Sequence, residues 1–224
     1  GHGTQMTQLP VENPLFKLLE RRLDPAHLRQ RLTTELEREK RIFSQAVGFF
    51  HIDNWYSIHS VIRNTLRLSL LHAKARRNAL QLDITENTIS LPHLPTAFEN
   101  FKILHISDLH LDINEEMPLV LRDKIEKLEY DVCVITGDFR AKTFGAYDAA
   151  LVAMQKVANV MRAPTYAVLG NHDSVQMLPG LEAMGIQVLM NESVIIEREG
   201  SLLHMAGIDD PHYFSADNLE RAYD

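Results

Sequence analysis

From residue 101 onward, short apolar runs alternate with helix-like segments, and this alternation constrains the fold more than any other feature of the sequence. The runs FKILHIS, DVCVIT and TYAVL have the length and apolar composition of buried strands. PLVLRDKIEKLE and YDAALVAMQKVANVM lie between them and have the pattern of helices. Strand–helix–strand repeats predict crossover connections, and therefore an α/β domain with parallel strands.

Three more apolar runs follow Gly185, and no helix-like segment separates them. They are IQVLM, SVIIERE and LLHMAGI, with turn residues between them. Short strands joined only by turns favour pairing with a neighbour along the chain. We therefore expect the sheet to become mixed in this region.

The first hundred residues are predicted to be mainly helical. Residues 13–50 carry Leu, Ile and Phe among dense charges, and the pair Asp24-Pro25 predicts a break between two helices. Residues 80–101 alternate enough to suggest strand pieces, and two prolines mark the join to the second half. We therefore divide the chain into a helical extension with a strand-like connector, residues 1–98, and a second domain, residues 99–224.

Residues 56–81 form a further basic, amphipathic candidate helix, in which apolar side chains alternate with arginine and lysine. Two interpretations stay open. The helix packs against its own domain, or it lies on an anionic membrane surface or a partner.

The charge of the chain is distributed unevenly. The formal net charge is -7, but residues 1–100 hold 13 Lys and Arg against 10 Asp and Glu, a net of +3. Residues 101–224 hold 10 against 20, a net of -10. This asymmetry indicates that the two halves have different roles.

Cysteine content and hydropathy restrict the compartment. The single cysteine, Cys133, lies inside an apolar run, which excludes a disulfide framework and favours a reducing compartment. No apolar segment approaches the ~18 residues needed to span a membrane, and the N-terminus lacks a signal-peptide pattern. We expect a cytoplasmic protein, with peripheral contact to the inner membrane through residues 56–81 as the open alternative, and no specific nucleic-acid binding.

Polar side chains follow each of the first three predicted strands. The first strand is followed by Asp108 and His110, the second by Asp138, and the third by Asn171, His172 and Asp173. The carboxyl ends of parallel strands share one edge of the sheet, which is where α/β proteins bind their ligands. We therefore expect these side chains to lie close together.

Carboxylates gathered in a partly dry cleft repel by several kcal/mol unless a cation lies between them. Carboxylate, imidazole and amide oxygen suit manganese, iron or zinc. In an extended chain Asp108 and His110 would point to the same side, and Asp138 is placed to bridge two ions. Gly137 and Gly170 would let the backbone pass close to the metals.

The motifs ISDLHL, TGDF and LGNHD, in this order and spacing, resemble those of the calcineurin-like metallophosphoesterases, particularly their bacterial branch. The resemblance covers residue 101 to about residue 211, and GIDDPHYF is also similar to that branch. It implies a four-layer αββα sandwich with a two-metal centre that hydrolyses phosphoesters. Mn²⁺ is the metal we expect, with Fe or Zn as alternatives.

The resemblance also implies a role for each residue. Asp108 and His110 would bind the first metal, Asp138 would bridge both, and Asn171 would bind the second. His172 would be the catalytic imidazole acting on the leaving oxygen, and Asp173 would orient it. Arg140 is either a clamp for a substrate phosphate or a surface residue. The other histidines considered default to structural positions: His105 in the core or behind the ligands, and His204 and His212.

A later His and a GHxH motif, which the family uses as further ligands, are not found by residue 224. The resemblance therefore implies that the C-terminal part of the sandwich is missing from this sequence. Two functions are carried forward. One is a hydrolase for a phosphomonoester, a phosphodiester or a nucleotide pyrophosphate, including a lipid-linked substrate of the UDP-diacylglucosamine type. The other is a non-catalytic metal-binding or interaction domain with an incomplete centre.

Overall fold

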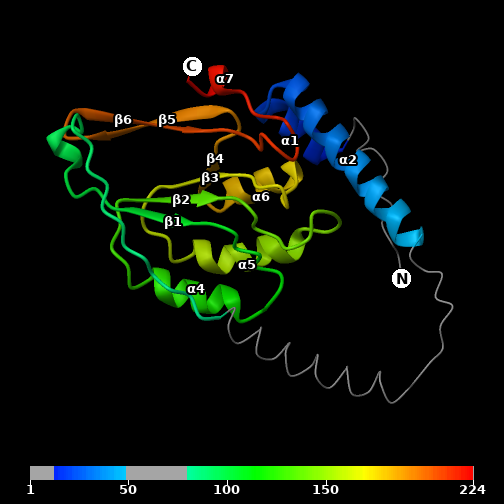
Figure 1. Ribbon diagram of the computed structural model, residues 1–224, viewed down its shortest axis with the longest axis horizontal. Coiled ribbons are helices and arrows are strands. Elements are labelled where there is room, and N and C mark those ends of the chain that lie inside the picture. The colour runs from blue at the N-terminus through cyan, green and yellow to red at the C-terminus, as the bar shows by residue number, and fades with distance from the viewer. Residues whose placement is uncertain (1–12, 49–79, 224) are drawn as a thin grey trace, which may run out of the picture.

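The computed structural model describes residues 13–48 and 80–223. Two helices, α1 (Pro14–Arg22) and α2 (Pro25–Gly48), begin the described chain and lie beside the strand-containing part (Figure 1). The side chain of Asn13 accepts a hydrogen bond from the N–H of Leu15, and that of Asp24 accepts from the N–H of Ala26. These caps define where each helix begins, and they confirm the predicted break at Asp24-Pro25.

The four strands of the central sheet are parallel and lie in the order β1-β2-β3-β4. Helices connect them, as the alternating pattern predicts. The strands are β1 (Ile103–Ile106), β2 (Val132–Thr136), β3 (Thr165–Val168) and β4 (Ile186–Val188). The connecting helices are α4 (Met117–Ile125), α5 (Asp148–Ala158), the 3₁₀ turn η2 (Val175–Met177) and α6 (Leu178–Ala183).

The hydrophobic core lies between the parallel sheet and its helices. Ile135 of β2 and Ala167 of β3 are buried together with Met154 and Val157 of α5. Cys133 is also fully buried, and this burial raises the pKa of its thiol to about 12. The thiol therefore belongs to the core, as the sequence predicted.

The prediction of a mixed sheet after Gly185 is wrong. β4 extends the parallel sheet, because the short helix α6 separates it from β3. The next two strands, β5 (Glu192–Arg198) and β6 (Ser201–Gly207), pair with each other in an antiparallel hairpin and, among the described strands, with no other. Its two-residue turn, Glu199-Gly200, has positive φ angles at both positions, the turn geometry that favours a tight hairpin.

Figure 1 shows the layers: α4 and α5 lie on one side of the parallel sheet, and the β5–β6 hairpin lies on the other. Helix α7 (Leu219–Tyr223) contacts the hairpin. This α/β arrangement is consistent with a metallophosphoesterase sandwich, while its predicted fourth layer stays a prediction.

The predicted strand pieces in residues 80–101 are absent. This stretch contains only the 3₁₀ turn η1 (Thr96–Phe98), and most of its side chains are exposed. Its two prolines lack the N–H that a strand ladder needs. The candidate basic helix at 56–81 lies almost wholly outside the described residues and stays a prediction. None of the described helices is long and apolar enough to cross a membrane.

Candidate metal centre

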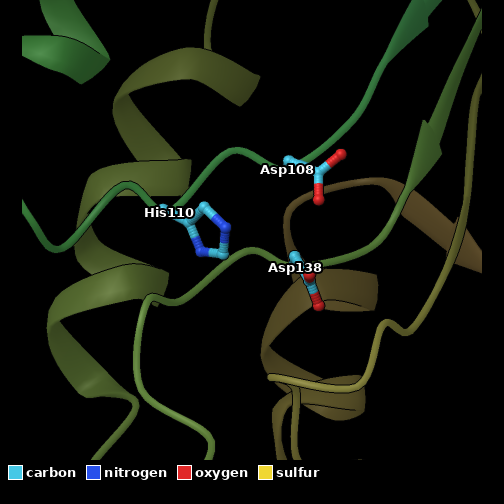
Figure 2. Close-up of side chains that lie close together, drawn as sticks. All are labelled: Asp108, His110 and Asp138. Atoms are coloured by element: carbon cyan, nitrogen blue, oxygen red, sulfur yellow. The ribbon is translucent and has the colours of Figure 1, made fainter. Parts of the chain in front are cut away.

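Two neighbouring loops bring together the three residues predicted to bind the first metal. Asp108 and His110 lie in the loop after β1, and Asp138 lies directly after β2. One ligand atom from each lies within 4.8 Å of the others. Figure 2 shows the three side chains around a common space. The prediction that the carboxyl ends of the strands gather these side chains is confirmed.

The backbone at these residues is not extended, contrary to the expectation for Asp108 and His110. The φ angles of Asp108, His110 and Asp138 are 54°, 40° and 55°, in the left-handed region. Such a conformation costs on the order of 1–3 kcal/mol for a residue other than glycine, and it persists only where the surroundings impose it. Here the N–H of His110 donates to the carbonyl of Asp138 over 2.9 Å, which ties the two loops together.

The imidazole of His110 is oriented for binding a cation. Its Nδ1 lies 2.8 Å from the carbonyl oxygen of Arg140. A carbonyl can only accept, so Nδ1 carries a proton, and in the neutral imidazole the lone pair is on Nε2. Metal-bound histidines are commonly held in this way by a backbone carbonyl. The donor set of two carboxylates and one neutral imidazole therefore fits a divalent cation such as Mn²⁺, Fe²⁺ or Zn²⁺.

Glycines allow the loops at Asp138 to approach each other closely. A Cβ on Gly170 would lie 2.2 Å from Oδ1 of Asp138, and one on Gly137 would lie 2.3 Å from the nitrogen of Gly170. Gly137 also has a φ angle of 83°, which side chains disfavour. The sequence predicted that these glycines let the backbone pass close to the metals. The close approach that the structure shows is between the two loops.

Asp173 differs from its predicted role of orienting His172. Its side chain is 1% exposed, and its carboxylate accepts hydrogen bonds from the backbone N–H groups of Asp138, Phe139 and Gly170 over 2.8, 2.9 and 2.9 Å. Burial raises the pKa of this carboxyl to about 6, against the opposing effect of the amide donors. Asp173 therefore joins the loops after β2 and β3 through backbone amides, whereas the ring of His172 contacts the carbonyl of Ala141.

His172 lies beside the three-residue cluster. Its ring meets that of His110 edge to face, with 4.9 Å between centroids, and the backbone N–H of His172 donates to Oδ1 of Asp138 over 3.0 Å. Its Nδ1 lies 2.5 Å from the carbonyl oxygen of Ala141, which is the group that orients the ring. Since a carbonyl only accepts, Nδ1–H donates and Nε2 is left for chemistry.

Asn171 and Arg140 complete the loops around the site. Asn171 is half-buried immediately before His172, and its role as a ligand stays a prediction. Arg140 is 3% exposed, and its guanidinium donates to the carbonyls of His172 and Gly145 over 2.5 and 2.7 Å. It is therefore not a surface residue. Two of its five N–H donors hold the backbone of the neighbouring loops, and its contact with a substrate phosphate stays a prediction.

The three other histidines considered in the sequence are not members of the cluster that the described residues form. His105 is exposed on β1 and contacts the hydroxyl of Thr136 over 2.8 Å, so it is not in the core, and the alternative place behind the ligands stays a prediction. His204 and His212 are exposed. The sequence also missed two groups that orient imidazoles, the carbonyls of Arg140 and Ala141, since a backbone carbonyl leaves no residue-type signal.

The model of the calcineurin-like phosphoesterase family matches residues 101–219, more than half of the chain. The chain belongs to this family. It is 36% identical over 149 residues to the uncharacterized metallophosphoesterase YkoQ of Bacillus subtilis, covering 61% of this chain and 53% of that protein. It is also 33% identical over 171 residues to the probable inactive purple acid phosphatase 28 of Arabidopsis thaliana, covering 64% and 42%.

A third relative is the transmembrane protein with metallophosphoesterase domain of Bos taurus, 29% identical over 145 residues, which cover 57% of this chain and 31% of that protein. The chain thus matches about half or less of the length of each of these relatives. Family membership accounts for the order of the strands and the motifs that follow them, and it leaves the substrate open.

Proposed function

We propose that this chain is a metal-dependent phosphoester hydrolase with two divalent cations, Mn²⁺ first and Fe or Zn as alternatives. The observation that carries the proposal is the cluster of Asp108, His110 and Asp138, with the imidazole of His172 against that of His110. The first cation would be held by these three ligands. Asp138 and Asn171 would hold the second.

Bound divalent cations supply activated water and positive charge that neutralises the phosphoryl oxygens. The chain's own contribution centres on His172. Its Nδ1 is fixed on the Ala141 carbonyl, so its protonated Nε2 can donate to the oxygen that leaves phosphorus. Asp173 holds the loops of Asp138 and His172 at a fixed distance through its amide contacts. This arrangement supports acid catalysis by His172 beside the cluster of Asp108, His110 and Asp138.

Within this class we propose a phosphomonoester, a phosphodiester or a nucleotide pyrophosphate as substrate. A lipid-linked pyrophosphate of the UDP-diacylglucosamine type is favoured by the basic, amphipathic pattern of residues 56–81, which suits an anionic amphiphile or membrane surface. The alternative function is a non-catalytic metal-binding or interaction domain. The name of one relative, a probable inactive phosphatase, keeps that alternative in view.

Turnover of generic substrates discriminates between the two functions. The full-length natural protein should hydrolyse an aryl phosphate or a bis-aryl phosphate in Mn²⁺, and chelation of the metal should abolish the reaction. A protein that binds Mn²⁺ but does not hydrolyse an aryl phosphate, a bis-aryl phosphate or a nucleotide pyrophosphate would support the non-catalytic alternative. The sensitivity of any turnover to Asp138→Asn separates it from a contaminating phosphatase.

A further inference from the structure

Helix α2 of the N-terminal extension contacts the loop that carries His172. The carboxylate of Glu35 accepts a hydrogen bond from the hydroxyl of Ser174 over 2.6 Å and from the N–H of Val175 over 2.8 Å. Ser174 and Val175 are buried and begin the turn η2, directly after Asp173. Glu35 therefore satisfies donors at the start of this turn, in the manner of a helix cap supplied from a distant part of the chain.

Arg31 lies one turn earlier on α2 and contacts the same loop. It is fully buried, and its Nη2 donates to the carbonyl of Asp173 over 3.2 Å. Its Nε lies 3.4 Å from Glu35 and 3.5 Å from Asp209, and its guanidinium stacks 3.3 Å from the ring centre of Phe214. Burial raises the pKa of the Glu35 carboxyl, and the positive charge of Arg31 opposes this rise without cancelling it.

Four consecutive residues of the loop, 172–175, are held by contacts from two sides. The carboxylate of Asp173 joins it to the loop after β2, and Arg140 donates to the carbonyl of His172. On the other side, α2 contacts the carbonyl of Asp173, the hydroxyl of Ser174 and the N–H of Val175. A buried, charged network contributes little net stability over an apolar contact, but it fixes positions with directional bonds.

We propose that Glu35 is a positioning residue, which fixes the turn after Asp173 and so keeps His172 beside the cluster of Asp108, His110 and Asp138. This inference rests on the proposed function, because it assigns α2 a part in the work of His172. A misplacement of a catalytic group by about 1 Å can cost on the order of 10²-fold in rate. Loss of the two bonds to Glu35 should therefore lower kcat more than it lowers substrate binding.

The test uses the full-length protein with Mn²⁺ and a bis-aryl phosphate. Glu35→Ala should lower kcat by about 10–100-fold and leave KM and the Mn²⁺ stoichiometry near those of the wild type. Glu35→Gln should recover much of kcat, since its amide oxygen still accepts from Val175. Arg22→Gln is the matched control. This variant removes the ion pairs of Arg22, on α1, to Glu182 and Glu192, which are not in the loops of the site. It should leave kcat unchanged.

A double-mutant cycle separates positioning from general damage. If Glu35 acts through His172, Glu35→Ala should cost almost nothing further in kcat when His172 is already alanine. Equal losses in both backgrounds, or a kcat of Glu35→Ala within about twofold of wild type, would overturn the proposal.

Hydrogen exchange tests the same point without turnover, so that a failure of the proposed function can be told apart. Amides in residues 170–177 should exchange faster in Glu35→Ala than in the wild type, while amides of β1 and β2 in that variant should not. In Arg22→Gln, amides in residues 170–177 should exchange as in the wild type. Unchanged protection of residues 170–177 would overturn the positioning role whether or not the protein is active. If Glu35→Ala speeds exchange in this loop as predicted but the wild-type protein shows no turnover, the proposed hydrolase function alone is refuted.

Discussion

Replacement of Gly170 by alanine tests whether the loop after β3 has to pass close to Asp138. The new Cβ would lie 2.2 Å from Oδ1 of Asp138 and 2.6 Å from its backbone nitrogen, whereas real Cβ contacts are at least 3.0 Å. The gap to the carboxylate oxygen therefore has to widen from 2.2 Å to at least 3.0 Å. Either the loop moves away from the cluster, or the Asp138 side chain turns away from it.

Both responses have a cost in stability and in metal binding. Forcing an additional methyl group into a packed site costs about 1–3 kcal/mol of unfolding free energy. Disturbing a group that orients a ligand typically weakens metal affinity about 10–100-fold. We therefore expect Gly170→Ala to lower both the unfolding midpoint in urea and the affinity for Mn²⁺ measured by calorimetric titration.

Gly207→Ala provides the matched control. Its Cβ would lie 2.4 Å from Cβ of Leu189 and 2.9 Å from Val168, so the overlap is comparable but involves apolar side chains and no predicted ligand. We expect a similar loss of stability with an unchanged affinity for Mn²⁺. The reasoning is refuted if Gly170→Ala binds Mn²⁺ as tightly as the wild type, or if Gly207→Ala loses as much affinity.

Three further substitutions test the assigned roles. Asp138→Asn should lower metal content and remove turnover together, by elemental analysis and a bis-aryl phosphate assay, and full turnover in this variant would exclude a bridging carboxylate. His172→Ala should reduce the rate by roughly 10²–10⁴-fold with near-normal metal content, and a metal loss equal to that of Asp138→Asn would contradict its role in acid catalysis. In Asp173→Asn the side-chain amide places an N–H donor against backbone N–H groups that donate to the carboxylate in the wild type. Urea unfolding should therefore show a loss of about 2–6 kcal/mol of unfolding free energy. A loss below about 1 kcal/mol would argue against the place of Asp173 between the loops.

The sheet and the position of the site follow from local sequence patterns. β1, β2 and β3 are short apolar runs between helical segments, and the parallel arrangement brings Asp108, His110 and Asp138 to one edge. The hairpin β5–β6 was not predicted as a separate sheet. Its pairing depends on a two-residue turn, Glu199-Gly200, whose φ angles are set by the folded backbone.

The supporting contacts of the site could not be predicted in the same way. The carboxylate of Asp173 binds amides of residues 33 to 35 positions earlier, and backbone donors look alike at every position of a sequence. Arg31 and Glu35 are spaced by four residues on α2, which is also the pattern of a solvated ion pair on a helix surface. Only the packing of α2 against the loop distinguishes the two cases.

The central claim is that Asp108, His110 and Asp138 bind a divalent cation, and calorimetric titration of Mn²⁺ into His110→Ala tests it most directly. His105→Ala is the matched control, because it removes an exposed imidazole from β1 that contacts Thr136 and lies outside the cluster. We predict that His110→Ala weakens Mn²⁺ binding by at least about 10-fold and that His105→Ala binds like the wild type. Equal affinity in wild type and His110→Ala would contradict the proposed metal centre.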